Sequence, residues 1–346
     1  MASAGFRQIK PESIRLSSEK LGITPLEFYL NNITDDRPVQ ASVAKLFLAQ
    51  PASKPLMYPV DLYGGGYEAI RNFMFHSLTR NTTLRPVNVR IKECNILETL
   101  QGGNRVSGKV TVVFQYDLEK DWGNIPLTQY RAIANYTRSV NDMTVVEPSL
   151  RKLLVNSLKF INTWMNNEAH QNVLLARRVK LSFTDYLDQD ADTVYYQVSR
   201  PLIWDDFLAK VPDSRYTAAV FPSFGYDLRR DFKNGVIRVN LAVKVYMVKS
   251  ASWVRHGRQD NYALNHEQRH FDLVKLIAER FKEKLITEKL NPDNYEGIIN
   301  YEYIEFYREM NRLQTKYDLE TSHGSNAGMQ REWNRSIDND LAALIR

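Results

Sequence analysis

The sequence predicts an α+β fold with two domains, and three observations carry this prediction. The chain has 346 residues, of which 43% are hydrophobic, so it is long enough to bury more than one core. Strand-like and helix-like segments are mixed in the first half, whereas the apolar spacing is helical from Leu264 onward. Between the halves, residues 185–192 contain four aspartates and are typical of a linker. We therefore expect domains at residues 1–184 and 185–346.

The first domain is predicted to contain four strands and two helices. Three glycines, Gly64 to Gly66, lack the spacing and the GK[ST] ending of a phosphate-binding loop, so a flexible turn before a helix is the better interpretation. Residues 106–116 alternate apolar side chains on one face, as a half-buried antiparallel strand does. The predicted strands are residues 26–33, 87–97, 106–116 and 130–140, and the predicted helices are residues 67–78 and 150–164.

The second domain is predicted to begin with strands and to end with helices. Residues 218–227 and 236–249 are the expected strand pair, with a hairpin turn at residues 231–235. The second of these strands alternates apolar residues on one face from Val239 to Met247. After it, the period of the pattern changes from two to between three and four, which predicts helices to the end of the chain.

Composition excludes several classes of protein. The net charge of +6 is spread along the chain with no long basic run, so nucleic acid is not an expected partner. Cys94 is the single cysteine, which excludes an intramolecular disulfide and a cysteine-based metal cluster. No run of 18 apolar residues predicts a transmembrane helix. The first residues lack the regions of a secretory signal, which leaves open a cytoplasmic protein or a mature, trimmed form.

The segment His266-Glu267-Gln268-Arg269-His270 carries the pattern HExxH. On a helix, positions i and i+4 lie one above the other, so both imidazoles project from one face and can bind one Zn²⁺. Glu267 is expected to lie beside the metal without binding it. There its carboxylate can take a proton from zinc-bound water and pass it to a leaving group.

The residues that follow this pattern favour a helix. Apolar side chains recur at spacings of three and four in one stripe, at Phe271, Val274, Ile277, Ala278, Phe281 and Leu285. The alternative is that HExxH arose by chance, because the pattern is short. The chain has only six histidines, so two of them at i and i+4 around a glutamate make chance the weaker explanation.

A catalytic zinc site needs a third protein ligand. His323 precedes Gly324, which can end the preceding helix, and a helix end directed at the active helix is a natural place for a distant ligand. The alternative for His323 is a capping histidine that interacts with the helix dipole. Asp318 and Glu320, in the same segment, are the alternative ligands. The remaining histidines are expected to have no ligand role: His76, His170 and His256.

Four short sequence motifs, one of which contains HExxH, occur in order in the second half of the chain. They lie at Trp204–Phe207, Lys249–Trp253, His266–Phe271 and Tyr317–Gly324, and Gln330 and Trp333 follow them. This order resembles the bacterial family of secreted zinc-dependent proteases and is far more specific than HExxH alone. The matching part runs from Trp204 to Trp333. Arg269 departs from the pattern, where a small residue is expected, which concerns local packing and not the ligands. The resemblance implies His323 as the third ligand and export to the cell envelope.

The first domain resembles the small α+β domains of bacterial envelope lipoproteins, although no motif in it allows residues to be matched. A lipid anchor that the present sequence does not carry is compatible with this resemblance.

We expect a zincin-like second domain that acts as a zinc-dependent metallohydrolase, a peptidase for peptide or protein substrates. Glu267 is the expected base, and Tyr317 or His256 is expected to stabilise the oxyanion. The strand Arg238–Lys249 is expected to lie above the active helix and to align an extended peptide. The alternative from another class is an envelope binding or scaffold protein with a structural or vestigial zinc site. An open coordination position beside Glu267 favours the enzyme, and a closed four-ligand site favours the scaffold.

Overall fold

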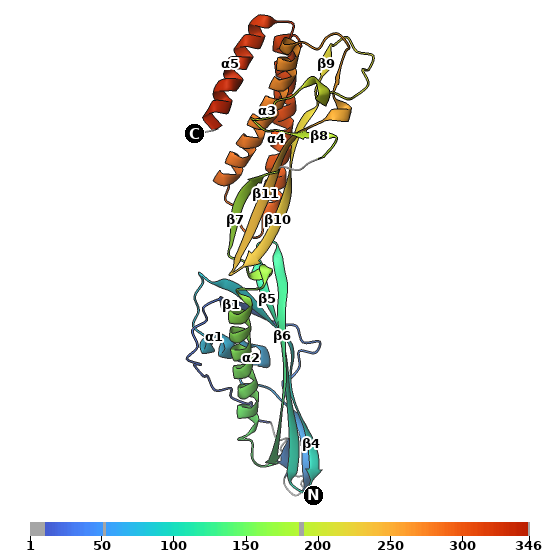
Figure 1. Ribbon diagram of the computed structural model, residues 1–346. Coiled ribbons are helices and arrows are strands. Elements are labelled where there is room, and N and C mark those ends of the chain that lie inside the picture. Colours follow the sequence, from blue (N-terminus) through green and yellow to red (C-terminus); the bar gives the residue numbers. More distant parts are fainter. Residues whose placement is uncertain (1–10, 51–52, 187–189, 345–346) are drawn as a thin grey trace. The chain divides into compact units, whose positions relative to one another are not determined.

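The computed structural model describes residues 11–50, 53–186 and 190–344. The chain divides into two compact units, Met1–Ala169 (unit 1) and His170–Arg346 (unit 2), each of which combines helices with a sheet (Figure 1). The predicted α+β class is confirmed. The division precedes the expected boundary at residue 184, because the strand at residues 178–185 pairs with a strand of unit 2. The expected linker, residues 185–192, therefore lies inside unit 2, and its residues 187–189 lie outside the described part.

Unit 1 contains a six-stranded sheet whose last three strands form a long antiparallel meander. The first strand pairs in parallel with the beginning of the fourth strand, and the second pairs in parallel with a short stretch farther along it. The four predicted strands are present, and three of them are longer than expected. The strands are β1 (Phe28–Asp35), β2 (Ala44–Gln50), β3 (Ser53–Val60), β4 (Arg85–Gly102), β5 (Arg105–Lys120) and β6 (Gly123–Ser139).

Two strands, β2 and β3, have no counterpart in the sequence prediction. β3 contains Pro55 and Pro59, and a proline within a run argues against a strand because it cannot donate to the ladder. In the structure β3 lies at the edge of the sheet and pairs with β2. An edge position tolerates proline, so the strand forms despite its composition.

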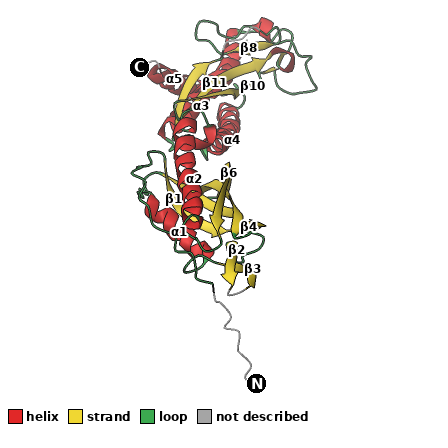
Figure 2. Cartoon of the chain, turned by 90° about the horizontal axis from the view of Figure 1, so that it is seen from below, coloured by secondary structure: helices red, strands yellow, loops and turns green. Residues whose placement is uncertain are grey.

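The two helices of unit 1 are α1 (Gly66–Ser77) and α2 (Val146–Glu168), as the apolar spacing predicts. Figure 2 shows both on one side of the strands of this unit. α2 packs against β5 and β6, where the fully buried Tyr116 donates a hydrogen bond from its hydroxyl to the carbonyl oxygen of Ser157 at 3.0 Å. The core of unit 1 also contains an ion pair between Glu98 and Arg138, whose side chains are both 0% exposed.

Unit 2 contains a four-stranded sheet with β11 at its centre. β11 pairs with β10 on one side, and with β7 and β8 on the other. The hairpin turn consists of Asn234 and Gly235, with φ of 54° and 74°, as a two-residue turn between twisted strands requires. The turn is shorter than predicted because β10 extends to Lys233, whereas β11 begins at Val236 as expected. The strands are β7 (Arg178–Asp185), β8 (Thr193–Tyr195), β10 (Pro222–Lys233) and β11 (Val236–Val248), with a separate pair β9 (Ala218–Ala219) and β12 (Trp253–Val254).

Three helices form the rest of unit 2, as predicted for the C-terminal part: α3 (Asn261–Thr287), α4 (Tyr295–Thr321) and α5 (Ala327–Leu344). The apolar stripe predicted for α3 is buried, with Phe271, Ile277 and Phe281 at most 1% exposed, and it packs on β10 and β11. Short 3₁₀ turns occur at Val173–Leu175, Trp204–Asp206 and Lys249–Ala251. Among the described residues, no helix is long and apolar enough to cross a membrane.

Candidate metal centre

α3 brings His266, Glu267 and His270 together near its first turns. The helix begins after Asp260, whose side chain accepts a hydrogen bond from the backbone N–H of Ala263 at 2.8 Å. This cap satisfies an N–H group that the helix itself leaves without a partner. All three residues of the pattern are buried, at 5 to 8% exposure, although glutamate is seldom buried without a partner. The predicted helical context of HExxH is therefore confirmed.

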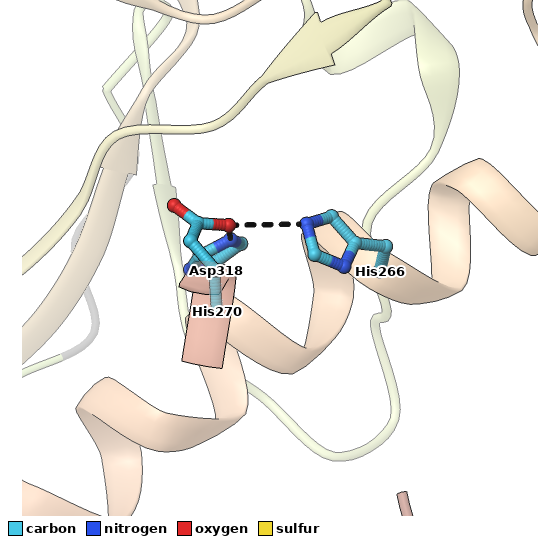
Figure 3. Close-up of side chains that lie close together, drawn as sticks. All are labelled: His266, His270 and Asp318. Carbon is cyan, nitrogen blue, oxygen red and sulfur yellow. Dashed lines mark hydrogen bonds and ion pairs between the residues drawn. The ribbon is translucent and has the colours of Figure 1, made fainter. Parts of the chain in front are cut away.

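Asp318, in the last turn of α4, faces both histidines (Figure 3). Its Oδ1 atom lies 3.0 Å from Nε2 of His270 and 3.3 Å from Nε2 of His266. One ligand atom from each of these three residues lies within 4.8 Å of the other two. The structure thus assembles two imidazoles and one carboxylate from two helices.

The outer nitrogen of each imidazole contacts a glutamine. Nδ1 of His270 contacts Oε1 of Gln314, whose own Nε2 donates to the carbonyl oxygen of His270 at 3.2 Å. A carbonyl can only accept, so this bond fixes the orientation of the amide and makes Nδ1 of His270 the donor. Nδ1 of His266 lies 2.9 Å from Oε1 of Gln330, whose Nε2 donates to Oδ1 of Asn334 at 2.9 Å.

These tautomers leave the two inner nitrogens as acceptors. Nε2 of His266 and Nε2 of His270 then face Oδ1 of Asp318, and no proton is present between three acceptors unless an imidazole is protonated. Such a group can hold a cation, either a proton or a metal ion. For metal bonds of roughly 2.0–2.1 Å, two ligands of a tetrahedral zinc ion lie about 3.3 Å apart, which is close to the observed nitrogen–oxygen distances. The residues therefore fit zinc.

The pKa values of His270 and Asp318 depend on the burial of both residues and on their contacts with neighbouring charged groups. Burial lowers the pKa of His270, but Asp318 and Glu267 outweigh it, so the pKa is raised. Burial raises the pKa of Asp318, but its hydrogen bonds with His266 and His270 outweigh it and hold the pKa well below its usual range. Asp318 is therefore an anion, which is the form that binds a metal ion.

Glu267 lies beside the two histidines and is oriented by another segment. Its Oε2 atom accepts a hydrogen bond from the backbone N–H of Val220, directly after β9, at 2.9 Å. Burial raises the pKa of the Glu267 carboxyl group, although the two imidazoles act in the opposite direction. A raised pKa brings a carboxylate closer to the range in which it can accept and return a proton near neutral pH.

A pocket of about 1140 Å³ opens over this group. One wall consists of residues 214–221, which include β9, and the other consists of the N-terminal part of α3 and the loop that follows α4. His266, Glu267, His270 and Asp318 all line the pocket. The group is thus accessible to a ligand from one side.

His323, the expected third ligand, lies at the rim and not in the inner group. Its Nδ1 atom is 3.4 Å from Oδ1 of Asp318, and its side chain is 36% exposed. Its ring lies against Tyr216, with centroids 4.1 Å apart and an interplanar angle of 36°. The helix ends in left-handed conformation at Ser322 and His323, both with φ of 49°, and His323 contacts Asp318 from beyond the helix end. Asp318, the alternative ligand, takes the inner position.

Tyr317 does not have the position expected of an oxyanion donor. The residue is fully buried, and its ring lies 4.8 Å from the ring of His266 and 4.7 Å from that of His270. Its hydroxyl accepts a hydrogen bond from Gln330 at 2.6 Å and faces the carbonyl oxygen of His266 at 3.3 Å. Because these contacts lie behind the imidazoles, Tyr317 positions the histidines and does not face the pocket.

Two further candidate residues and the expected substrate-binding strand have no part in the inner group. His256 is exposed and does not line the pocket, and Glu320 accepts a hydrogen bond from Nε1 of Trp333 at 2.9 Å, so neither joins the inner group. The expectation that the strand Arg238–Lys249 aligns a substrate is wrong, because β11 has paired strands on both sides. The strands that line the pocket are β9, with both of its residues, and β12, with Trp253.

The structure adds Gln314 to the residues that the sequence suggested. Gln314 and Asp318 are four residues apart on α4, so they lie on the same face of the helix. This spacing was available as a signal, but glutamine is too common on helices for the spacing alone to point to a metal site.

Comparisons with known proteins add little to these observations. No known protein family matches the sequence, and no curated protein matches it. A Xanthomonas campestris protein of the DUF330 family is similar in structure at 7% identity and a TM-score of 0.30, over 45% of this chain and 96% of that chain. A minor lipoprotein from Acinetobacter baumannii is similar at 14% identity and a TM-score of 0.21, over 40% of this chain and 91% of that chain. TM-scores this low do not establish a shared fold, so neither likeness has weight for function.

Proposed function

We propose that unit 2 is a zinc-dependent hydrolase, with His266, His270 and Asp318 as the zinc ligands and Glu267 as the general base. The observation that carries the proposal is the convergence of three acceptor atoms, with the outer nitrogen of each imidazole engaged by a glutamine. Three protein ligands are what a catalytic zinc site uses, since the fourth position is left for the reaction.

In the proposed reaction, zinc and residues of the chain have different roles. Zinc lowers the pKa of water to about 7 and polarises a carbonyl group. Glu267 lines the pocket beside the ligands, where its carboxylate accepts a proton from the attacking water and returns it to the leaving group. The hydrogen bond from Val220 holds this carboxylate in place.

We propose a peptide or protein as the substrate. β9 pairs on one side with β12, and its residues line the pocket. An extended peptide can add to the other side of such a strand through main-chain hydrogen bonds. The resemblance over Trp204–Trp333 to secreted zinc-dependent proteases supports the same substrate class and export to the cell envelope.

Metal analysis of the full chain, purified without chelator, tests the site. We expect about one zinc per chain, and loss of zinc in His266→Ala and His270→Ala. Wild-type metal content in both variants would reject the assignment. Glu267→Gln then tests the reaction, because it keeps the shape of the side chain and removes the basic carboxylate. Zinc should stay bound while hydrolysis of a peptide library falls by a factor of about 10² to 10⁴.

The alternative function is an envelope binding or scaffold protein with a structural zinc site. One contact favours it: Nδ1 of His323 lies 3.4 Å from Oδ1 of Asp318, close enough for this imidazole to supply a fourth ligand after a rotation. A site with four protein ligands would leave no position for the reaction. X-ray absorption of the zinc-loaded protein distinguishes the two, since three protein ligands support the hydrolase and four support the scaffold.

A further inference from the structure

A second pocket, of about 510 Å³, lies on unit 2 near the edge of the sheet that β10 forms. Four tyrosines line it, Tyr195 from β8, Tyr226 from β10, Tyr246 from β11 and Tyr303 from α4. Tyr303 and Asp318 both lie on α4, 15 residues apart, which corresponds to about 22 Å along the helix axis. The pocket is therefore separate from the candidate metal centre.

The tyrosine rings are held in place by contacts with one another. Tyr195 and Tyr246 have centroids 6.5 Å apart with an interplanar angle of 54°, and Tyr226 and Tyr303 have centroids 5.3 Å apart with an angle of 83°. The Tyr226 hydroxyl donates to Oδ1 of Asn300 at 2.6 Å, and the Tyr303 hydroxyl donates to the carbonyl oxygen of Phe224 at 3.2 Å. Fixed aromatic walls lose little entropy when a ligand binds.

Gly225, the fourth residue of β10, also lines the pocket. A Cβ atom added there would meet nothing within 4 Å, and the residue has no positive φ, so neither packing nor backbone conformation requires glycine. Glycine inside a strand weakens it and often marks a bulge, a bend, or a place where a ligand or another backbone approaches closely. The register of β10 with β11 is regular at Gly225, so there is no bulge here. The pocket keeps its depth because this position has no side chain.

The polar groups of the pocket select for a neutral ligand. Nζ of Lys244 lies 2.7 Å from Oδ2 of Asp227, so the ammonium is neutralised and does not attract an anion strongly. Within the described part of the chain, the Tyr246 hydroxyl, Oγ1 of Thr193 and Nδ2 of Asn300 have no hydrogen-bond partner. These groups are available to a ligand that offers several hydroxyls.

We propose that this pocket binds a short, neutral oligosaccharide. A sugar ring combines an apolar face of C–H groups, which packs on an aromatic ring, with hydroxyls that exchange hydrogen bonds with tyrosine, threonine and asparagine. The volume lies within the range of small-ligand sites. A rigid aromatic wall, a glycine in the lining and unpaired neutral polar groups together fit this class better than an ionic or a purely apolar ligand.

Titration calorimetry of the full chain with three probes tests the proposal: maltotriose, cellotriose and the β-1,4-linked trimer of N-acetylglucosamine. We expect saturable binding of at least one, with Kd of about 1 mM or tighter. Gly225→Leu fills part of the pocket and Tyr246→Ala removes a wall, and each should weaken this binding about tenfold or more.

Matched controls come from residues of unit 2 that do not line the pocket. Gly297 on α4 also has open space around a Cβ atom, so Gly297→Leu makes the same substitution elsewhere, and Tyr301 on α4 is 62% exposed, so Tyr301→Ala matches the second variant. Both controls should bind like wild type, and circular dichroism checks that all four variants fold. The proposal is overturned if no trisaccharide binds up to about 10 mM, if Gly225→Leu binds like Gly297→Leu, or if a deca-proline peptide binds in place of the sugars.

Discussion

Gln314 contacts His270 twice, with its amide oxygen at Nδ1 of the ring and its amide nitrogen 3.2 Å from the backbone carbonyl oxygen of the same residue. The pair connects α4 to α3 directly behind the candidate metal centre. Because one amide satisfies both the ring and the backbone, the imidazole has a fixed rotation and a fixed tautomer. Its Nε2 atom therefore faces Asp318 with a lone pair.

Replacing Gln314 should weaken zinc binding without removing a ligand. In Gln314→Ala the imidazole of His270 loses its hydrogen-bond acceptor, and we expect zinc affinity to fall by about 10- to 100-fold. Competition with a chromophoric chelator measures this. Asn311→Ala is the matched control, since it removes an amide side chain from an exposed position of the same helix. This variant should bind zinc like wild type. Equal affinities of the two variants would remove Gln314 from the site.

Asp318 and His323 should differ in their importance for zinc. Asp318 is central to the group, whereas His323 contacts it only from the rim. We expect Asp318→Ala to lose zinc affinity by more than about a hundredfold and His323→Ala to lose less than about tenfold. The same chelator competition ranks the two variants. The reverse order would restore His323 as the third ligand.

The helix that carries HExxH could be predicted from sequence because its signals are local. The i, i+4 spacing of His266 and His270 and the apolar stripe that follows depend only on the period of one helix. The choice between Asp318 and His323 depends instead on where α4 ends. Asp318 lies in the last turn of α4, whereas His323 follows the end of the helix, where the backbone of Ser322 and His323 is left-handed. The apolar period of a helix does not specify the backbone conformation beyond its end.

The domain boundary was missed for a similar reason. β7 lies between unit 1 and the aspartate-rich segment in sequence, but it pairs in parallel with β11, about 60 residues later. Such a pairing leaves no mark on either strand alone. β3 was missed because Pro55 and Pro59 argue against a strand until its edge position is known.

The metal-free protein should become less stable as the pH rises. Asp318 and Glu267 raise the pKa of His270 above its usual 6.5, despite burial. A raised pKa in the folded state contributes stability that is fully present below the unfolded pKa and is lost as the pH rises through the folded value. In excess chelator, the Tm of the zinc-sensitive transition should therefore fall as the pH rises from the usual pKa of 6.5 through the raised pKa of folded His270. His270→Ala should show a smaller change.

Zinc should reverse this dependence. The ion binds neutral imidazoles, so protons compete with it and its stabilising effect grows as the pH rises over the same interval. Differential scanning calorimetry with and without zinc gives both curves. A metal-free Tm that rises with pH would contradict the assigned contacts between His270 and the two carboxylates.

The ion pair inside unit 1 should matter for stability and not for metal binding. Glu98 accepts hydrogen bonds from Arg138 and from the Tyr136 hydroxyl, and both charged side chains are fully buried. Glu98→Gln leaves the Arg138 charge without its counter-ion, which should cost about 3–5 kcal/mol in the free energy of unfolding. Glu93→Gln breaks an exposed pair with Arg131 and should cost less than about 1 kcal/mol. Urea unfolding compares the two variants, and similar costs would contradict the role of the buried pair.

Replacing Gly324 should strain the backbone conformation at this residue and also displace the ring of His266. Its φ is +81°, and a Cβ atom added there would lie 3.3 Å from Cγ of the His266 ring. Gly257 has a φ of +74° with nothing within 4 Å of such an atom, so Gly257→Ala carries the conformational cost alone. That cost is about 1 kcal/mol of unfolding free energy for each substitution. Only Gly324→Ala should also displace the imidazole and weaken zinc binding, because the new methyl group presses on a ligand. If both variants bind zinc like wild type, His266 tolerates the displacement and the ring contact has no role in the site.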